Sequence, residues 1–472
     1  MYDTFIGLEI HIHLLTKSKQ FCGCRAHFGD EPNSNTCPVC LGYPGVLPAA
    51  NKESMEMSYA VAKALKCTLA KKCYFDRKNY FYPDMAKNYQ ITQFHEPAGI
   101  NGSFDIEVDG EIKTIKIHDV HLEEDAGKMI HSGKASLLDY NRAGSSLLEI
   151  VTEPDLRTGA EAEAFIREFR RVVRHLNVCD GNMEEGSLRC DANVSINYTG
   201  KGLGTKTEVK NLNSARFVRK ALEYEIKRQS KVIDGGGRVI QETRLWDGDK
   251  GVTASMRTKE EANDYRYFPE PDMPPFVTDE DFMSRVEKRM VELPLSRKFR
   301  YINDLKLLPD TADFIVENIN MAVIFDEVLK SGLEPKLVAN WFAGDVQSQL
   351  KRADLDIEKS NISSARLIEL INMIEEGRLQ RSKGKDVLMQ IIQDNKDVSD
   401  IVKENGWEQV FDESEMDNWV DEVIAKNSPA VDQIKDGNLK ILSFLLGQIM
   451  KASKGKADPK KARTILEKKL GL

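Results

Sequence analysis

Hydrophobic and polar residues alternate at the start of the chain. Between Gly7 and Leu14 every second residue is aliphatic, which predicts a β-strand with one apolar face. The other face carries Glu9, His11 and His13. A carboxylate and two imidazoles in a row on a strand suit metal or phosphate binding, although a half-buried strand with a solvated polar face explains the same pattern.

The same alternation predicts further strands in the first half of the chain. Residues 103–108 and 112–118 flank Asp109-Gly110, a dipeptide typical of hairpin turns. The hydrophobic phase slips between Ile117 and Val120, which predicts a β-bulge and leaves open which of the following carboxylates point inward. Other strands are expected within residues 146–155, 186–196 and 207–214.

Helical periodicity appears at residues 53–65 and 161–176, and it dominates beyond Phe282. Prolines between Tyr265 and Pro275 interrupt regular structure and mark an exit from the β-rich part. A chain of 472 residues is also too long for one core. The pattern therefore predicts an α+β protein with a β-rich domain at 1–292, a helical domain at 293–396 and a helical tail domain at 397–472.

The composition is that of an ordinary globular protein. It is 41% hydrophobic and 30% charged with a net charge of -8, which excludes wholesale disorder and argues against general coating of nucleic acid. A local basic surface stays possible. No apolar run approaches the roughly 18 residues of a membrane-spanning helix, and the chain starts on a strand pattern rather than a leader. We therefore expect a cytoplasmic protein without membrane contact.

Four of the eight cysteines form two close pairs, Cys22 with Cys24 and Cys37 with Cys40. CxC and CxxC turns let thiolates share one tetrahedral ion, and four ligands match a closed structural Zn²⁺ site. Four unrelated free thiols are the alternative. Because a closed site leaves no open coordination position, a zinc module at residues 22–40 would support folding rather than catalysis.

Aromatic and charged side chains are interleaved between residues 77 and 93. Arg77, Lys78 and Lys87 could meet phosphate while rings such as Tyr82 stack on a base. An aromatic-rich strand pair that packs in the core explains the composition equally well.

Carboxylates are dense in the predicted strands that follow. Glu123, Glu124 and Asp125 adjoin one another, and Glu149 shares a strand face with Glu153. Buried carboxylates need a cation or hydrogen bonds, and Mg²⁺ prefers hard oxygen ligands, so these positions favour a magnesium and nucleotide site. The later strands predict a polar cavity lined by Arg189, Asp191, Asn193, Glu208, Lys210 and Asn211.

The end of the chain is basic. Residues 451–470 hold eight lysines and arginines against two acidic residues. In a chain of net charge -8 this excess is a candidate contact for the RNA backbone, although a solvated helix is the alternative. The expected RNA contacts are Lys451, Lys454, Lys456, Lys460 and Lys461.

Ten ordered segments together resemble the B/E subunit family of aspartyl/glutamyl-tRNA(Asn/Gln) amidotransferases. They are GLEIHIHL, FCGC with CPVCLGYPGVLP, RKNYFYPD, HLEEDAGK, LLEIVTEPD, EEGSLRCDANVS, TEVKNLNS, DYRYFPEPD, ANWF and GQIMKASKGKADP. The archaeal E type of this family carries an inserted domain. Nothing between Asp272 and Leu293 leaves room for that insertion, so the resemblance is to the B type.

The resemblance implies a glutamine-synthetase-like cradle built on a large mixed β-sheet, then an all-α domain and a YqeY-like tail. It implies an ATP- and Mg²⁺-dependent enzyme that phosphorylates the side-chain carboxylate of Glu-tRNA(Gln) or Asp-tRNA(Asn) and then amidates it. The ammonia would come from an amidase-type glutaminase A subunit through an internal channel. A small C subunit would hold the A and B subunits together.

The resemblance also implies residue roles. Glu9, His11, Glu124 and Glu149 would form the magnesium-centred catalytic cluster. Asp191, Glu208 and Lys210 would line the same cavity and handle a second metal, ATP phosphates or the ammonia path. We expect ATP to be bound by Arg77, Tyr82, Lys87, Arg142 and Arg189.

Two other functions fit parts of the sequence. A tRNA-binding scaffold without catalysis would explain the cysteine module and the basic tail. A free-standing ATP-dependent ligase of glutamine-synthetase type would explain the carboxylates but not the long helical part.

Overall fold

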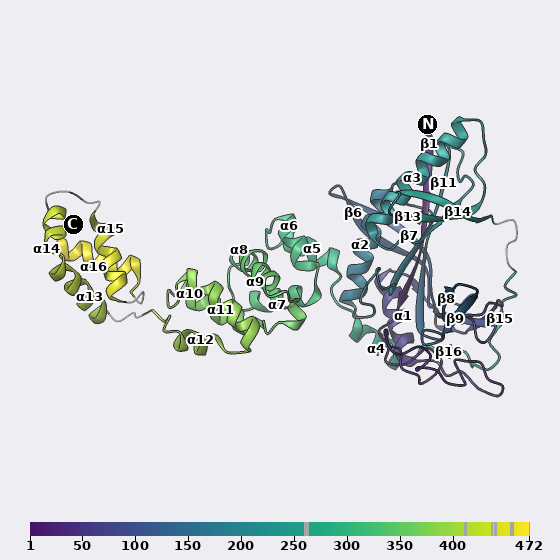
Figure 1. The fold of residues 1–472 in the computed structure, drawn as a ribbon, viewed down its shortest axis with the longest axis horizontal. Coiled ribbons are helices and arrows are strands. Elements are labelled where there is room, and N and C mark those ends of the chain that lie inside the picture. The colour runs from purple at the N-terminus through teal and green to yellow at the C-terminus, as the bar shows by residue number, and fades with distance from the viewer. Residues whose placement is uncertain (259–263, 410–412, 436–437, 439–440, 454–456, 472) are drawn as a thin grey trace. The chain divides into compact units, whose positions relative to one another are not determined.

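The computed structural model describes residues 1–258, 264–409, 413–435, 438, 441–453 and 457–471. It divides into two compact units, Met1–Arg297 and Lys298–Leu472 (Figure 1). A large mixed β-sheet dominates the first unit, and the described part of the second is helical. The α+β prediction is therefore confirmed. The three-domain division stays a prediction.

The first unit is built on a nine-stranded sheet. Its ladders are antiparallel except for the parallel pair β12 and β13. In spatial order the strands are β14 (Val252–Thr258), β13 (Glu242–Asp247), β12 (Thr207–Lys210), β11 (Leu188–Tyr198), β1 (Tyr2–His13), β10 (Ser146–Thr152), β7 (Glu111–Glu124), β6 (Gly99–Val108) and β2 (Thr68–Leu69).

Strand β1 lies in the middle of the sheet and alternates as its sequence predicts. Ile6, Leu8, Ile10 and Ile12 are at most 1% exposed. They belong to the hydrophobic core together with residues of α1 (Lys52–Ala64), α2 (Gly159–His175) and α3 (Ala215–Asp234). Because these helices cover the apolar face, the polar face of β1 is left for the chemistry described below.

Side-chain caps define where these three helices begin. Asn51, Thr158 and Ser214 each accept hydrogen bonds from backbone N–H groups of the first turn of α1, α2 and α3 respectively. The caps fix the helix starts, so the apolar stripes of the helices meet the sheet in register with its buried residues.

Strand β7 contains the predicted bulge. Val151 of β10 pairs with Asp119, but the next residue, Thr152, pairs with Ile117. His118 is thus an extra residue in the ladder between β7 and β10. The bulge lets Ile117 and Val120, which are separated by an odd number of positions, both enter the core.

Shorter strands complete the first unit. Strand β15 (Phe268–Pro269) pairs with β4 (Asp76–Asn79), and β4 pairs with β5 (Tyr89–Thr92). The proline-rich segment therefore returns to the strands around Arg77 before the chain leaves, instead of acting as a simple exit. The other short elements are β3 (Lys72–Cys73), β16 (Phe276–Val277), β8 (Lys128–Ser132), β9 (Ala135–Asp139) and α4 (Glu280–Arg289).

The second unit is helical in its described residues and begins within α5 (Pro294–Asn303). Two hydrophobic clusters form in it, one from Tyr301 to Val402 and one from Val420 to Leu466. The other helices are α6 (Pro309–Val316), α7 (Ile319–Leu329), α8 (Pro335–Asn340), the π-helix η1 (Trp341–Val346), α9 (Gln347–Ala353), the 3-10 helix η2 (Ile357–Lys359), α10 (Ser364–Glu375), α11 (Arg381–Asp394), α12 (Val398–Glu404), α13 (Glu413–Lys426), α14 (Ser428–Lys435), α15 (Leu442–Ala452) and α16 (Pro459–Leu470). Among the described residues, no helix has the length and apolar character needed to span a membrane.

Candidate functional site

A cluster of carboxylates and imidazoles lies on the polar face of the sheet, at its centre. Strand register places His11 opposite Glu149, and Glu149 opposite His121. His11 Nε2 lies 3.0 Å from Glu149 Oε2 and 3.6 Å from Glu123 Oε1. His121 Nε2 lies 3.3 Å from the same Glu149 oxygen. We call Glu9, His11, His121, Glu123 and Glu149 the central acidic cluster.

The central acidic cluster perturbs the pKa values of its members. Burial lowers the pKa of His11, but its hydrogen bond to Glu149 and the nearby carboxylates raise it to about 9. Burial and the charge of Glu149 raise the pKa values of Glu9 and Glu123. Burial acts on Glu149 too, but His121 and His11 hold its pKa well below the usual range. The carboxylates also raise the pKa of His121, so the cluster as a whole favours positive charge among its carboxylates.

Three of the four residues expected around magnesium belong to the cluster, and Glu124 does not. Glu124 pairs with Ser146 in the ladder, so its side chain lies on the other face of the sheet from Glu123. There it forms an ion pair with Lys87 and accepts a 2.9 Å hydrogen bond from the Ile91 backbone N–H. Lys87, which the sequence analysis expects at ATP, is the partner of Glu124 in this ion pair.

Asp191, Glu208 and Lys210 form a second group that adjoins Glu9. Register places Asp191 opposite Glu9, and Lys210 forms an ion pair with Asp191. Lys210 Nζ also lies 3.3 Å from Glu208 Oε1, while the other Glu208 oxygen accepts a 2.7 Å hydrogen bond from Thr243. Burial opposes the charge of Lys210, but the two carboxylates raise its pKa. The structure therefore brings these three expected residues together beside the central acidic cluster.

Asp125 is the centre of a third group, which contains two of the three arginines expected at ATP. Its Oδ2 lies 2.6 Å from His13 Nε2, 2.9 Å from Arg189 Nη2 and 3.3 Å from Arg142 Nε. Burial opposes ionisation, but Arg189, His13 and Arg142 hold the pKa of Asp125 below its usual range. His13 and Asp125 thus have a defined structural role, and Arg142 and Arg189 lie on the same side of the sheet as His11.

Arg77 and Tyr82 do not join these groups. Arg77 donates to both Glu270 oxygens at 2.6 and 2.7 Å, contacts Asp272 at 3.1 Å and stacks over the Tyr89 ring at 4.2 Å. Its guanidinium therefore holds strand β4 to the proline-rich segment. Tyr82 is 51% exposed.

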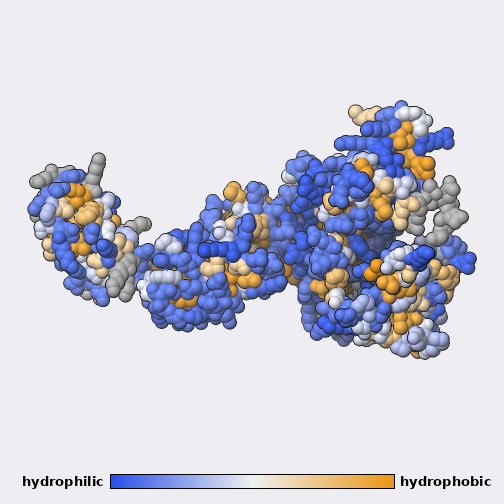
Figure 2. All heavy atoms as spheres, viewed as in Figure 1, coloured by the Kyte–Doolittle hydropathy of each residue, from blue (hydrophilic) through white to orange (hydrophobic). Residues whose placement is uncertain are grey.

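Exposed apolar side chains gather near the loop that contains Tyr82. Figure 2 shows hydrophobic residues over β8 and β9, where Ile130 and Leu137 are 45% and 57% exposed. At the end of this hairpin, Tyr140 donates a 2.7 Å hydrogen bond to the Pro83 carbonyl, which joins the hairpin to the loop of Tyr82. This rim offers rings and aliphatic groups to a partner that meets the first unit.

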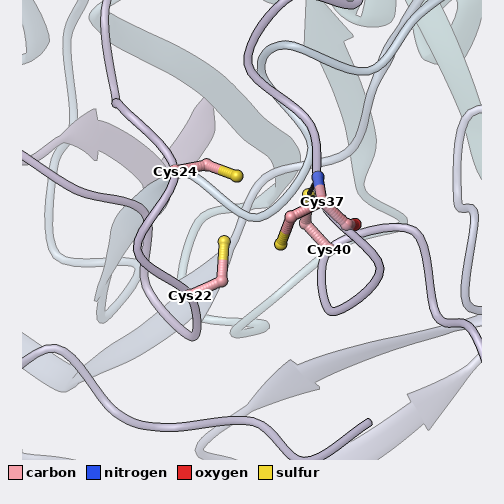
Figure 3. A group of neighbouring side chains, drawn as sticks. All are labelled: Cys22, Cys24, Cys37 and Cys40. Atoms are coloured by element: carbon pink, nitrogen blue, oxygen red, sulfur yellow. Dashed lines mark hydrogen bonds between the residues drawn. The ribbon is translucent and has the colours of Figure 1, made fainter.

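The four paired cysteines converge. Figure 3 shows their side chains pointing toward one another from two loops, and the four Sγ atoms lie within 4.8 Å of one another. The Cys40 Sγ accepts a 3.2 Å hydrogen bond from the Cys37 N–H, and Lys19 Nζ lies 3.7 Å away. The hydrogen bond from Cys22 lowers the pKa of Cys40 to about 4 although burial opposes this. The same contact raises the pKa of Cys22, and burial raises the pKa of Cys24, so the thiolate, the form that binds metal, is favoured at Cys40.

Of the five expected tRNA contacts, Lys451 and Lys461 are exposed, at the end of α15 and in α16. Lys454 and Lys456 lie outside the described residues, as does the side chain of Lys460. The role of this basic segment stays a prediction.

Among the members of the central acidic cluster, the sequence does not single out His121, and it places Glu123 among the dense carboxylates that favour magnesium but not in the expected catalytic set. Alternation from Val120 and Leu122 inward is enough to place both on the polar face, but the bulge obscures the phase. The sequence places Lys78 among aromatic residues, as one of the cations that could meet phosphate. Burial lowers its pKa, yet Glu123, Tyr267 and Glu149 raise it, so this ammonium faces the same cluster.

Two segments of the chain match models of known protein families. Residues 4–284 match the model of the GatB/GatE catalytic domain, and residues 323–470 match the GatB domain. A relative from Carboxydothermus hydrogenoformans is 45% identical over 99% of each chain, and one from Thermodesulfovibrio yellowstonii is 46% identical over 99% of each chain. Both relatives are named as the B subunit of an aspartyl/glutamyl-tRNA(Asn/Gln) amidotransferase.

Proposed function

Because the chain belongs to the family of aspartyl/glutamyl-tRNA(Asn/Gln) amidotransferase B subunits, we propose that it activates and amidates the side-chain carboxylate of Glu-tRNA(Gln), Asp-tRNA(Asn) or both. ATP supplies the activation, and glutamine supplies the ammonia through an amidase-type A subunit. A small C subunit completes the complex. The observation that carries the proposal is the central acidic cluster, which gathers buried and half-buried carboxylates that pair with no guanidinium group of the described residues.

The chemistry has two steps. A carboxylate oxygen attacks the γ-phosphorus of ATP, the bond from phosphorus to the ADP oxygen breaks, and an acyl phosphate forms. Ammonia then attacks the acyl carbon, and phosphate leaves with one proton of the ammonia, which yields the amide. Phosphorylation is needed because a free carboxylate is a poor electrophile. Positioning and charge neutralisation accomplish most of such a phosphoryl transfer.

The central acidic cluster fits a divalent cation. The ligand atoms of Glu9, His11 and Glu149 lie within 4.8 Å of one another, as do those of His121, Glu123 and Glu149. Ligands about 2.1 Å from Mg²⁺ lie roughly 3 to 4 Å apart, so small movements would close this set around an ion. When bound, Mg²⁺ would neutralise phosphate charge. Lys78 and Lys210 would contact phosphate oxygens from the two sides of the cluster.

Other elements fit partner contacts. We infer that the exposed loop of Tyr82 and the β8–β9 hairpin receive the acceptor end of tRNA, because exposed rings stack on unpaired bases. The basic residues after Gly447 would contact the tRNA backbone through their charge. The proposed cellular location is the cytoplasm, where mischarged tRNA is made.

The test uses the complex reconstituted with its A and C subunits. We expect γ-labelled ATP to lose its label and Glu-tRNA or Asp-tRNA to be amidated only when ATP, Mg²⁺ and glutamine are present. Binding of tRNA without phosphoryl transfer would support the scaffold alternative instead. ATP consumption that needs no tRNA would favour a ligase that acts on a free acid. Either result would contradict the proposal.

We also propose that the cysteine cluster holds structural Zn²⁺. Sulfur atoms about 2.3 Å from a tetrahedral zinc lie roughly 3.8 Å apart, which the observed spacing accommodates. Lys19, which is fully buried beside Cys40, would offset part of the charge of four thiolates. Metal analysis should find one zinc per chain, lost when Cys22 and Cys37 are replaced by serine and kept in Cys67→Ser. Zinc retained in the double variant would refute the assignment.

A further inference from the structure

Two guanidinium groups converge on one carboxylate beside the central acidic cluster. Arg142 and Arg189 both contact Asp125 Oδ2, and each arginine side chain is 39% exposed. The other Asp125 oxygen accepts a 2.8 Å hydrogen bond from the Ala126 N–H. Both oxygens of Asp125 are thus engaged. The two guanidiniums also meet other groups here: His13 lies 3.5 Å from Arg189 Nη2, and the charge of Arg142 acts on Asp84 as well as on Asp125.

The two arginines keep donors for a ligand. Arg142 uses Nε and Nη2 to hold the Ala126 and Gly127 carbonyls at 3.0 and 2.9 Å. Arg189 uses Nη2 for Asp125, and its Nε is buried without a hydrogen-bond partner. Among the residues that the structure describes, neither Nη1 group has a partner. Planar donor pairs of this kind match a carboxylate or a phosphate.

The place of the pair selects between these two ligands. Arg189 lies directly opposite His11 in the ladder between β1 and β11, so the two backbones are about 5 Å apart at this point. An anion on Arg189 therefore lies next to the central acidic cluster, where the phosphate chain of ATP would meet its metal. Two guanidiniums that already face Asp125 and Asp84 suit one further carboxylate, whereas a triphosphate carries several negative charges.

We propose that Arg142 and Arg189 bind the side-chain carboxylate of the aminoacyl group on tRNA, rather than ATP. This inference rests on the proposed function and deepens it. The site recognises the negative charge of the acid and holds one oxygen toward the γ-phosphorus. After amidation the side chain is a neutral amide, which forms weaker hydrogen bonds with a guanidinium than a carboxylate does. The same pair therefore separates substrate from product.

The experiment compares Arg189→Gln and Arg189→Lys with the unaltered complex. Arg167→Gln is the control, because Arg167 is 65% exposed and pairs with Glu163 on the surface of α2. We measure kcat/KM for Glu-tRNA, KM for ATP and inhibition by Gln-tRNA, or the Asp-tRNA and Asn-tRNA pair if that is the active one. Thermal unfolding of each complex checks that the fold is kept.

Arg189→Gln should lower kcat/KM for Glu-tRNA roughly 10- to 100-fold, leave KM for ATP within about twofold and leave inhibition by Gln-tRNA unchanged. Arg189→Lys keeps the charge but loses the planar donor pair, so its kcat/KM for Glu-tRNA should lie between that of the unaltered complex and that of Arg189→Gln. A raised KM for ATP with normal use of Glu-tRNA would assign the pair to nucleotide and overturn the inference. Equal weakening of Glu-tRNA and Gln-tRNA would overturn it as well.

The outcomes also separate this inference from its premise. If the unaltered complex does not amidate tRNA with ATP, the proposed function fails and the inference fails with it. If the unaltered complex is active and Arg189→Gln discriminates acid from amide as well as before, only the inference is wrong.

Discussion

Two groups of carboxylates have opposite partners: one lies at the centre of the sheet, and the other lies where α3 packs against the β13–β14 edge of the sheet. At the centre, Glu9, Glu123 and Glu149 lie beside the imidazoles of His11 and His121. At the edge, Glu225 and Glu242 are held by arginines and hydroxyl groups. Arg228 Nε lies 2.9 Å from both Glu225 oxygens, Arg244 Nη1 lies 2.7 Å from Glu242, and Thr253 and Ser255 donate to the two carboxylates.

The difference separates a binding site from a structural network. In the edge network, each carboxylate meets a guanidinium that keeps its charge at every relevant pH, and the pKa of Glu242 is lowered although burial opposes this. In the central acidic cluster the pKa values of Glu9 and Glu123 are raised. Burial alone therefore does not indicate function. A group of acids that meets imidazoles and lysines instead of guanidinium groups does.

The largest expected effect is on catalysis by the centre. Glu149→Gln removes the charge that both imidazoles contact, so amidation of aminoacyl-tRNA should fall about 1,000-fold. Glu242→Gln is the matched control from the edge network and should retain normal activity. Similar losses in both variants, measured as kcat/KM in the reconstituted complex, would abolish the distinction between the two groups.

The next effect concerns the edge network and appears in stability. Glu225 is fully buried, and Glu225→Gln leaves Arg228 and Arg244 without its charge. Because a buried ion pair with one partner removed is strongly destabilising, the free energy of unfolding should fall by about 3 kcal/mol. Denaturant unfolding measures this loss. Unchanged stability, or a changed Mg²⁺ requirement in the folded variant, would contradict a purely structural role.

A third comparison uses two neighbouring residues. Glu123→Gln removes a carboxylate of the central acidic cluster, so the Mg²⁺ concentration for half-maximal activity should rise about tenfold. Glu124→Gln leaves Lys87 without its buried partner, so it should lower the melting temperature instead and keep the Mg²⁺ requirement. Magnesium titrations of activity in both variants are the measurement. The opposite pattern would place Glu124 in the metal site.

The smallest effect is a pH dependence of stability. Since the pKa of Glu242 in the folded protein is below its usual value, its ionised form stabilises the fold above the unfolded-state pKa of about 4.3. That contribution is lost as the pH falls through the lowered folded-state pKa. Between pH 5 and pH 3 the gap in melting temperature between the unaltered protein and Glu242→Gln should therefore shrink by about 2 °C. A constant gap would mean that Glu242 does not titrate differently on folding.

Strand alternation is sufficient to find the centre of the site. The period of two places Glu9 and His11 on one face of β1, and it places Glu149 on a strand that the structure pairs with β1. The spacing of Cys22, Cys24, Cys37 and Cys40 is sufficient to predict that they converge. In these cases the deciding information is local, because neighbouring positions in one segment fix which side chains point together.

Partners distant in the sequence cannot be found in this way. Arg77 is engaged by Glu270, a residue 193 positions away, in a segment whose prolines predict only an exit from the domain. The choice between Glu123 and Glu124 depends on one extra residue in a ladder, which periodicity detects but does not orient. Sequence pattern therefore predicts the faces of single strands, whereas the pairing of strands decides which expected cations are free to meet a ligand.

The extra residue His118 has a consequence for how the chain tolerates insertions and deletions. Successive side chains of a strand point to opposite faces of the sheet. The bulge at His118 lets Ile117 and Val120 point to the same face although an odd number of positions separates them. Loss of His118 would leave both flanks of the ladder with β10 in their present phase. A single residue inserted between Leu122 and Glu123 would instead turn Glu123 into the core and bring Glu124 toward His11. One-residue length changes in β7 thus keep or reverse the faces of this strand according to where they fall relative to the bulge.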